Sequence, residues 1–156
     1  MRFGRVVLVG LALIAIASVV RAQFRQPDAV PDSAEGLSAR TAVPAPVMST
    51  LRRACFDCHS NETRWPWYSK LPVASWLLEQ DVKAARGQLN FSRWAQYNPF
   101  DRAGLLDKVC ELATEGKMPL PRYLMLHHEA RLSQTDVGQL CAWSQHEATR
   151  LVQGGS

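Results

Sequence analysis

The chain has 156 residues, 47% of them hydrophobic and 21% charged, which is an ordinary globular balance for one domain. Its formal net charge is +4, but three of the eighteen basic residues lie in the N-terminal segment. The rest of the chain has fifteen basic and fourteen acidic residues. This near-neutral balance argues against a nucleic-acid partner, because phosphate binding needs a clustered positive surface.

The first 22 residues have the features of an export signal. Arg2 and Arg5 precede an almost wholly apolar stretch over residues 6–20, and Val20-Arg21-Ala22 approximates a small-x-small cleavage site. Fifteen apolar residues fall short of the roughly 20 that a membrane-spanning helix needs, although flanking arginines extend the reach. We expect residues 1–22 to be a cleaved signal peptide or an inner-membrane anchor, with the protein in the periplasm.

Residues 23–46 are rich in Pro, Asp, Ser, Ala and Gly and have no sustained apolar period, which predicts a flexible linker. We expect the folded domain to occupy residues 47–150. Its first helix should run straight into a cysteine motif, since the residues that recur at helical spacing are Val47, Met48, Leu51, Ala54, Cys55 and Cys58.

Two helices are expected in the middle of the domain. The first covers residues 73–86, with Trp76, Leu77 and Val82 facing inward. The second covers residues 100–115 and ends at Gly116, which is a plausible C-terminal cap. A short turn over residues 90–94 should connect them.

A last helix should begin at Ser133, because Asp136 three residues later forms a capping box with it. Before it, residues 117–128 contain two prolines and are expected to be extended loop. One face of the last helix carries Val137, Leu140, Cys141, Ser144 and Ala148. There is no alternating strand pattern, so the expected fold class is all-α.

The motif Cys55-Phe56-Asp57-Cys58-His59 has the C-x-x-C-H spacing typical of c-type haem attachment. Two thiols three residues apart reach the two vinyl groups on adjacent pyrroles, and the next residue, His59, then points its imidazole at the iron. A thioredoxin-like redox pair lacks the required βαβ pattern, and a zinc site lacks a second closely spaced pair. A structural disulfide between Cys55 and Cys58 stays open.

The second axial ligand of the iron has several candidates, which are Met118, Met125, His127, His128 and His146. We favour Met118, because Pro119 stiffens the loop that carries it and can hold a thioether over a flat ring. A Met118–iron bond would raise the reduction potential relative to two histidines. A packing role for Met118 stays open.

Aromatic residues follow the motif in a proline-containing loop. Trp65, Trp67 and Tyr68 are close enough in sequence to fold back on the porphyrin, where Tyr68 or Trp67 would donate a hydrogen bond to a propionate. Simple core packing of these rings is an equal alternative. Candidate propionate partners with positive charge are Arg64, Lys70 and Arg93.

With these residues in view, the chain resembles the bacterial haem-binding domain family built around a C-x-D-C-H-S-N motif, a relative or look-alike of class I cytochromes c. The resemblance implies a small cytochrome c-like helical domain wrapped round one covalent haem c, in an exported or membrane-anchored protein. The Met118 ligand matches the wider cytochrome c pattern, in which a Met-Pro loop precedes the last helix. The matching positions are Cys55 to Thr63, Trp65 to Ser69, Ser75 to Leu77, Asp81-Val82, Leu89 to Ser92, Trp94, Met118-Pro119, Tyr123, His127 or His128, Ala130 to Ser133 and Trp143.

Cys110 and Cys141 do not belong to the family pattern. They lie on two helices that can pack together, and an oxidising compartment permits a disulfide. A disulfide and two buried thiols both stay open, because sequence does not fix the distance between their Cα atoms.

We expect a one-electron carrier that transforms no substrate and passes electrons to an unknown redox partner. Two alternatives share the same haem attachment. One is a peroxidase-like haem enzyme with an open sixth iron position and His127 or His128 as general acid/base. The other is a sensor that binds a small ligand at that position. The iron ligands separate these functions, whereas the fold does not.

Overall fold

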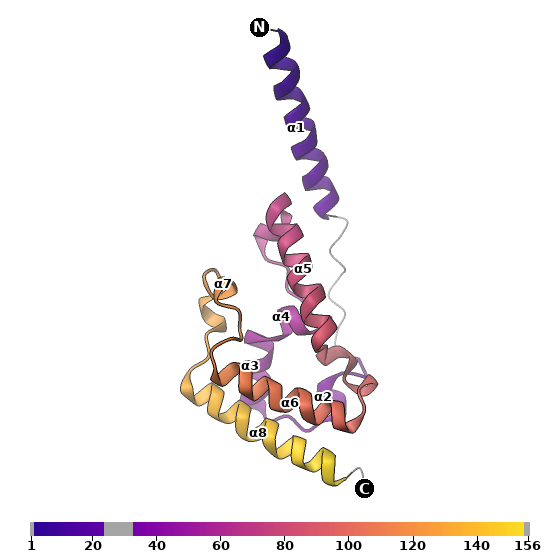
Figure 1. Cartoon of the computed structure of the whole chain (residues 1–156), viewed down its shortest axis with the longest axis vertical. Coiled ribbons are helices and arrows are strands. Elements are labelled where there is room, and N and C mark those ends of the chain that lie inside the picture. Colours follow the sequence, from indigo (N-terminus) through magenta and orange to yellow (C-terminus); the bar gives the residue numbers. More distant parts are fainter. Residues whose placement is uncertain (1, 24–32, 155–156) are drawn as a thin grey trace.

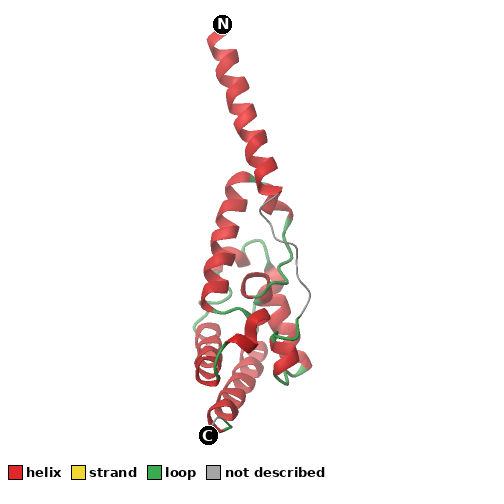
Figure 2. Cartoon of the chain, turned by 90° about the vertical axis from the view of Figure 1, so that its right-hand side faces the viewer, coloured by secondary structure: helices red, strands yellow, loops and turns green. Residues whose placement is uncertain are grey.

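The computed structural model describes residues 2–23 and 33–154, and all regular secondary structure in them is helical (Figures 1 and 2). The all-α prediction is therefore confirmed. The elements are α1 (Arg2–Gln23), α2 (Leu37–Arg40), α3 (Ala45–Ala54), α4 (Phe56–His59), α5 (Pro72–Gln88), α6 (Pro99–Thr114), α7 (Pro121–Leu124) and α8 (Gln134–Gln153), with 3-10 turns η1 (Trp67–Lys70), η2 (Phe91–Gln96) and η3 (His128–Ala130).

Helix α1 covers the predicted leader and extends away from the rest of the chain (Figure 1). Its apolar side chains are exposed along its length, from Val6 to Val20. Within the described ranges, none of the helices reaches the combination of length and apolar character needed to cross a membrane.

The core of the domain lies between α6 and α8, which run side by side in opposite directions (Figure 1), and α3 packs against α8. A disulfide joins Cys110 of α6 to Cys141 of α8, with the two Cα atoms 4.7 Å apart, so the disulfide alternative is the correct one. Leu106 and Leu140 are almost fully buried between these helices. Burial of such side chains typically stabilises a fold by about 1.5 to 3 kcal/mol each.

The predicted linker is wrong for its second half, because the segment from residue 33 onward packs on the domain. The Leu37 side chain is buried in the core, and Ala95 donates its backbone N–H to the Glu35 carbonyl at 2.9 Å. The buried Thr41 hydroxyl accepts a hydrogen bond from the indole N–H of Trp94 at 3.0 Å. The first half of the predicted linker, residues 24–32, lies outside the described residues.

Helix α5 begins one residue before its predicted range and ends two residues after it, so that Gly87 lies inside the helix. Val82 is buried as predicted, but Trp76 and Leu77 are 58% and 45% exposed, so their predicted inward orientation is wrong. The reason is that the first half of α5 extends beyond the α6 and α8 core (Figure 1). A helical period identifies a common face but not whether a neighbour covers it.

The remaining boundaries follow the sequence closely. Gly116 has φ 65° just after α6, in the left-handed region expected of a glycine cap. The Ser133 hydroxyl accepts from the Asp136 N–H at 3.1 Å while the Asp136 carboxylate accepts from the Ser133 N–H at 2.8 Å, which confirms the capping box. The segment predicted as extended loop, 117–128, differs because it contains the short helix α7.

Candidate functional site

The cysteine motif sits where two helices meet. Helix α3 ends at Ala54, the φ of −124° at Cys55 breaks the helix, and α4 begins at Phe56. The backbone N–H groups of Cys58 and His59 both donate to the Cys55 carbonyl, at 3.2 and 2.9 Å. Phe56 points into the core and stacks on Phe91 with ring centres 5.3 Å apart. This stacking fixes the turn that carries the two thiols.

Cys55, Cys58 and His59 line one cavity of about 520 Å³, which lies in the size range of cofactor sites. Its walls are largely apolar and come from α5, α6 and the segment that follows α6. The other lining residues are Ala54, Asp57, Asp81, Ala84, Ala85, Gln88, Leu89, Phe91, Leu105, Lys108, Val109, Leu112, Ala113, Met118, Pro119, Leu120, Arg122, Tyr123, Leu132 and Leu140.

The His59 imidazole is held in one tautomer. Its Nδ1 lies 3.0 Å from the Leu89 carbonyl oxygen, which only accepts hydrogen bonds, so Nδ1 carries the proton. Burial lowers the pKa of His59 below its usual value, which keeps the ring neutral near pH 7. Nε2 therefore has a free lone pair, and a backbone carbonyl on the other nitrogen is the usual way that a metal-binding histidine is oriented.

The two motif thiols are free and half-buried. Burial raises the pKa of Cys55 to about 12 and that of Cys58 to about 11. A redox-active cysteine pair needs the opposite, a lowered pKa that gives a reactive thiolate. The structural disulfide between Cys55 and Cys58 is absent. In the described part of the chain, no group of three or more His, Cys, Asp or Glu residues is arranged to hold a metal ion.

Met118 lies on the wall of the same cavity, 60 positions beyond Cys58 in sequence. The backbone N–H groups of Lys117 and Met118 both donate to the Leu112 carbonyl at the end of α6, at 3.0 and 3.1 Å. The other candidate ligands, which are Met125, His127, His128 and His146, do not line the cavity. The structure thus brings together His59 and Met118 from the predicted set.

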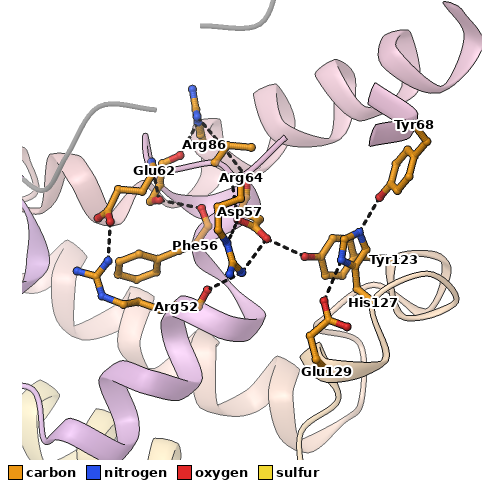
Figure 3. Close-up of polar contacts among 12 residues, drawn as sticks. Arg52, Phe56, Asp57, Glu62, Arg64, Tyr68, Arg86, Tyr123, His127 and Glu129 are labelled. Atoms are coloured by element: carbon orange, nitrogen blue, oxygen red, sulfur yellow. Dashed lines mark hydrogen bonds and ion pairs between the residues drawn. The ribbon is translucent and has the colours of Figure 1, made fainter. Parts of the chain in front are cut away.

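The aromatic loop lies outside the cavity walls. Trp67 is 75% exposed and contacts Tyr68 edge to face, while Trp65 is half-buried. The Tyr68 hydroxyl lies 2.7 Å from Nε2 of His127, and Nδ1 of the same ring lies 3.1 Å from a Glu129 carboxylate oxygen (Figure 3). Both nitrogens of His127 are therefore engaged away from the cavity.

None of the three predicted propionate partners lines the cavity. The cations on its walls are Lys108 and Arg122, which the sequence analysis did not select. Lys108 pairs with Glu111 at 2.7 Å, and Arg122 pairs with Asp81 across the space between α7 and α5, with Nε 3.2 Å from the carboxylate. Arg122 reaches the cavity wall because α7 returns toward α5, and no local sequence pattern indicates this position.

Asp57, between the two cysteines, accepts hydrogen bonds from two directions (Figure 3). The Arg64 backbone N–H donates to Oδ1 at 3.0 Å, and the Tyr123 hydroxyl donates to Oδ2 at 3.0 Å. Behind the motif, Arg86 donates to the Ser60 carbonyl at 2.8 Å. The motif is thus fastened to the loop after it, to α5 and to α7.

Residues 12–146 match the family model described as a haem-binding domain. No curated protein and no solved structure matches the chain.

Proposed function

The chain belongs to the haem-binding domain family, and on that basis we propose that it carries one covalent haem c and acts as a one-electron carrier in the periplasm. One observation carries this proposal. A single apolar cavity is lined by both thiols of the C-x-x-C-H motif, by His59 and by Met118. The residues proposed for covalent attachment and for the two iron ligands thus come from one set of walls.

The residues present fit such a group. Cys55 and Cys58 would hold the group through two thioether bonds, each formed by addition of a thiol to one vinyl group with the thiol hydrogen going to the other vinyl carbon, so that no oxidant would be needed. His59 offers Nε2, because the Leu89 carbonyl holds its other nitrogen. When bound, the haem iron supplies the one-electron redox chemistry, and the apolar walls limit access of water to it.

Met118 is the proposed second axial ligand. Its backbone is fixed to Leu112 at the end of α6, and Pro119 stiffens the next position. A thioether ligand favours the ferrous state relative to imidazole, which suits a carrier that accepts electrons in an oxidising compartment.

The two histidines predicted as general acid/base for the enzyme alternative lie outside the cavity walls. Acid/base chemistry on a bound peroxide needs a titratable group within hydrogen-bond reach of the open iron position. His127 and His128 do not line the cavity, and the ring of His127 is engaged by Tyr68 and Glu129. A Met118 ligand would also close the position that an enzyme or a sensor uses.

Export across the inner membrane is part of the proposal. The basic start and the apolar residues 6–20 support it, as does the Cys110–Cys141 disulfide, since such bonds persist in oxidising compartments. We propose association with the inner membrane through this segment and an unidentified redox protein as partner, with no role in nucleic-acid binding. Whether residues 1–22 are removed is a measurable outcome of fractionation and N-terminal sequencing.

The test is spectroscopy of the full chain, produced in a host with c-type cytochrome maturation. The oxidised protein should show a sulfur-to-iron charge-transfer band that disappears in Met118→Ala. Met125→Ala is the matched control, because Met125 is 71% exposed and outside the cavity walls, and it should keep the band. A high-spin spectrum that Met118→Ala leaves unchanged would discard the Met118 ligand and favour the enzyme and sensor functions.

A further inference from the structure

One hydrogen bond joins the cysteine motif directly to the segment that carries Met118. Tyr123 lies on α7, five positions after Met118, and its hydroxyl donates to Oδ2 of Asp57 at 3.0 Å (Figure 3). Asp57 stands between the two cysteines, so covalent attachment of haem at Cys55 and Cys58 also fixes its backbone. Tyr123 and Asp57 both line the cavity.

The ring of Tyr123 also has a stacking partner. The imidazole of His127 stacks on it with ring centres 4.1 Å apart and planes 7° apart. His127 is itself held by the Tyr68 hydroxyl at 2.7 Å and by Glu129 at 3.1 Å. These contacts leave the tyrosine ring little freedom, so its hydroxyl is presented to Asp57 in one orientation.

The burial of Asp57 and the protonation of Tyr123 both favour this hydrogen bond. The side chain of Asp57 is only 14% exposed, so its charge needs donors, and Arg64 supplies the others with Nε 3.2 Å away. Burial and the nearby carboxylate raise the pKa of Tyr123, which keeps the hydroxyl protonated and able to donate. A hydrogen bond to a partly buried carboxylate is stronger than one between neutral groups.

The other attachments of this segment lead elsewhere. The backbone N–H of Met118 itself bonds on the α6 side, to the Leu112 carbonyl. Arg122 pairs with Asp81 of α5, and Arg53 of α3 donates to the carbonyl of Arg131, beyond α7, at 2.9 Å. Among these contacts, the Tyr123 hydroxyl is the one that ends on the motif between the cysteines.

We infer that Tyr123 is a positioning residue that holds the Met118 segment at a fixed distance from the haem-bearing turn and so keeps the thioether on the iron. The inference rests on the proposed function. Loss of the hydroxyl leaves the fold and the covalent haem in place but lets the Met118 segment move away, which opens the sixth iron position to added ligands.

The experiment uses the full haem-loaded chain and imidazole as the added ligand. Tyr123→Phe should weaken the sulfur-to-iron band and raise the imidazole affinity of the ferric protein by about tenfold or more, the factor that such a hydrogen bond contributes to an equilibrium. Thr50→Val is the matched control, since the Thr50 hydroxyl also donates to a carboxylate, that of Asp136 at 3.0 Å, and neither residue lines the cavity. It should leave both the band and the affinity unchanged.

A second pair of variants separates positioning from general stability. Asp57→Asn keeps an oxygen acceptor for Tyr123 and should retain most of the band, whereas Asp57→Ala should match Tyr123→Phe. Equal imidazole affinities for Tyr123→Phe, Thr50→Val and the parent would overturn the inference while the proposed function stands. A parent protein with covalent haem but no sulfur-to-iron band would overturn the Met118 ligand first and this inference with it.

Discussion

The α6–α8 pair and the region around the cavity are stabilised in different ways. Between the two helices, Leu106 and Leu140 are almost completely buried, a disulfide joins Cys110 to Cys141, and a capping box starts α8 at Ser133. Around the cavity, the cysteine motif, α5, α6 and the segment after α6 surround a space of about 520 Å³, and polar side chains connect α7 to the motif and to α5.

The difference shows which half needs the cofactor. Close-packed interiors leave few voids larger than a water molecule, so an apolar cavity of this size lacks the contacts that normally stabilise its walls. A bound haem would supply those contacts. The α6–α8 pair is stabilised by its own packing and disulfide, whereas the order of the cavity region would depend on the bound haem.

Removal of haem should therefore have the largest effect, and only on one region. When the chain is produced without c-type maturation, we expect amide hydrogen exchange in residues 54–59 and 117–124 to speed up by orders of magnitude. The helices α6 and α8 should keep most of their protection near the disulfide. Hydrogen-exchange mass spectrometry of the two forms measures this, and equal acceleration in both regions would contradict the comparison.

The next largest effect should follow from removal of the disulfide. The double variant Cys110→Ser/Cys141→Ser opens a loop with a sequence separation of 31, which corresponds to about 3 to 4 kcal/mol of stability. Urea unfolding of the haem-loaded protein measures the loss. The absorption spectrum should stay that of the parent, because neither cysteine lines the cavity. A changed iron spectrum would show that the two regions are not independent.

A smaller effect is expected at the start of α8. Ser133→Ala removes the side-chain acceptor for the Asp136 N–H and should cost about 1 kcal/mol, as is typical of N-cap substitutions. Thermal unfolding under matched conditions measures it. Ser33→Ala is a suitable control, because the Ser33 hydroxyl donates to the Ser92 carbonyl and accepts from the Glu35 N–H, both at 3.3 Å, and caps no long helix. An equal loss of stability in both variants would contradict a specific contribution of the helix cap.

The smallest effect concerns acid. Hydrogen bonds from Ser133 hold the pKa of Asp136 down to about 2, against an ordinary 3.8. The unfolded chain thus binds more protons between these values, so this contribution is complete above about pH 4 and declines as the pH falls toward 2. Asp136→Asn should reduce the pH dependence of the urea unfolding midpoint over that interval. A midpoint that falls equally in parent and variant would assign the acid sensitivity to other carboxylates.

The predictable part of the fold consists of features encoded locally. The capping box at Ser133 and the glycine cap at Gly116 follow from neighbours a few positions apart, and both are present. The wrong predictions depended on distant partners. Trp76 and Leu77 stay largely exposed because they lie beyond the α6 and α8 core, and Leu37 is buried because η2 comes back against α2.

The candidate site divides in the same way. The cysteine motif is one continuous segment, so its spacing alone indicates haem attachment, and Met118 was selected from the proline beside it. The contacts of Tyr123 with Asp57 and of Tyr68 with His127 join residues 66 and 59 positions apart. No period or local motif carries such information, because it arises only when α7 returns to the motif.

The central claim is that Cys55 and Cys58 bind one haem covalently, and the mass of the intact denatured protein tests it most directly. After production of the full chain in a host with c-type maturation, the denatured polypeptide should be heavier by one haem, and Cys55→Ala/Cys58→Ala should carry none. Cys110→Ser/Cys141→Ser should keep the added mass. A parent chain that loses its haem on denaturation, or retains it without Cys55 and Cys58, would contradict the claim.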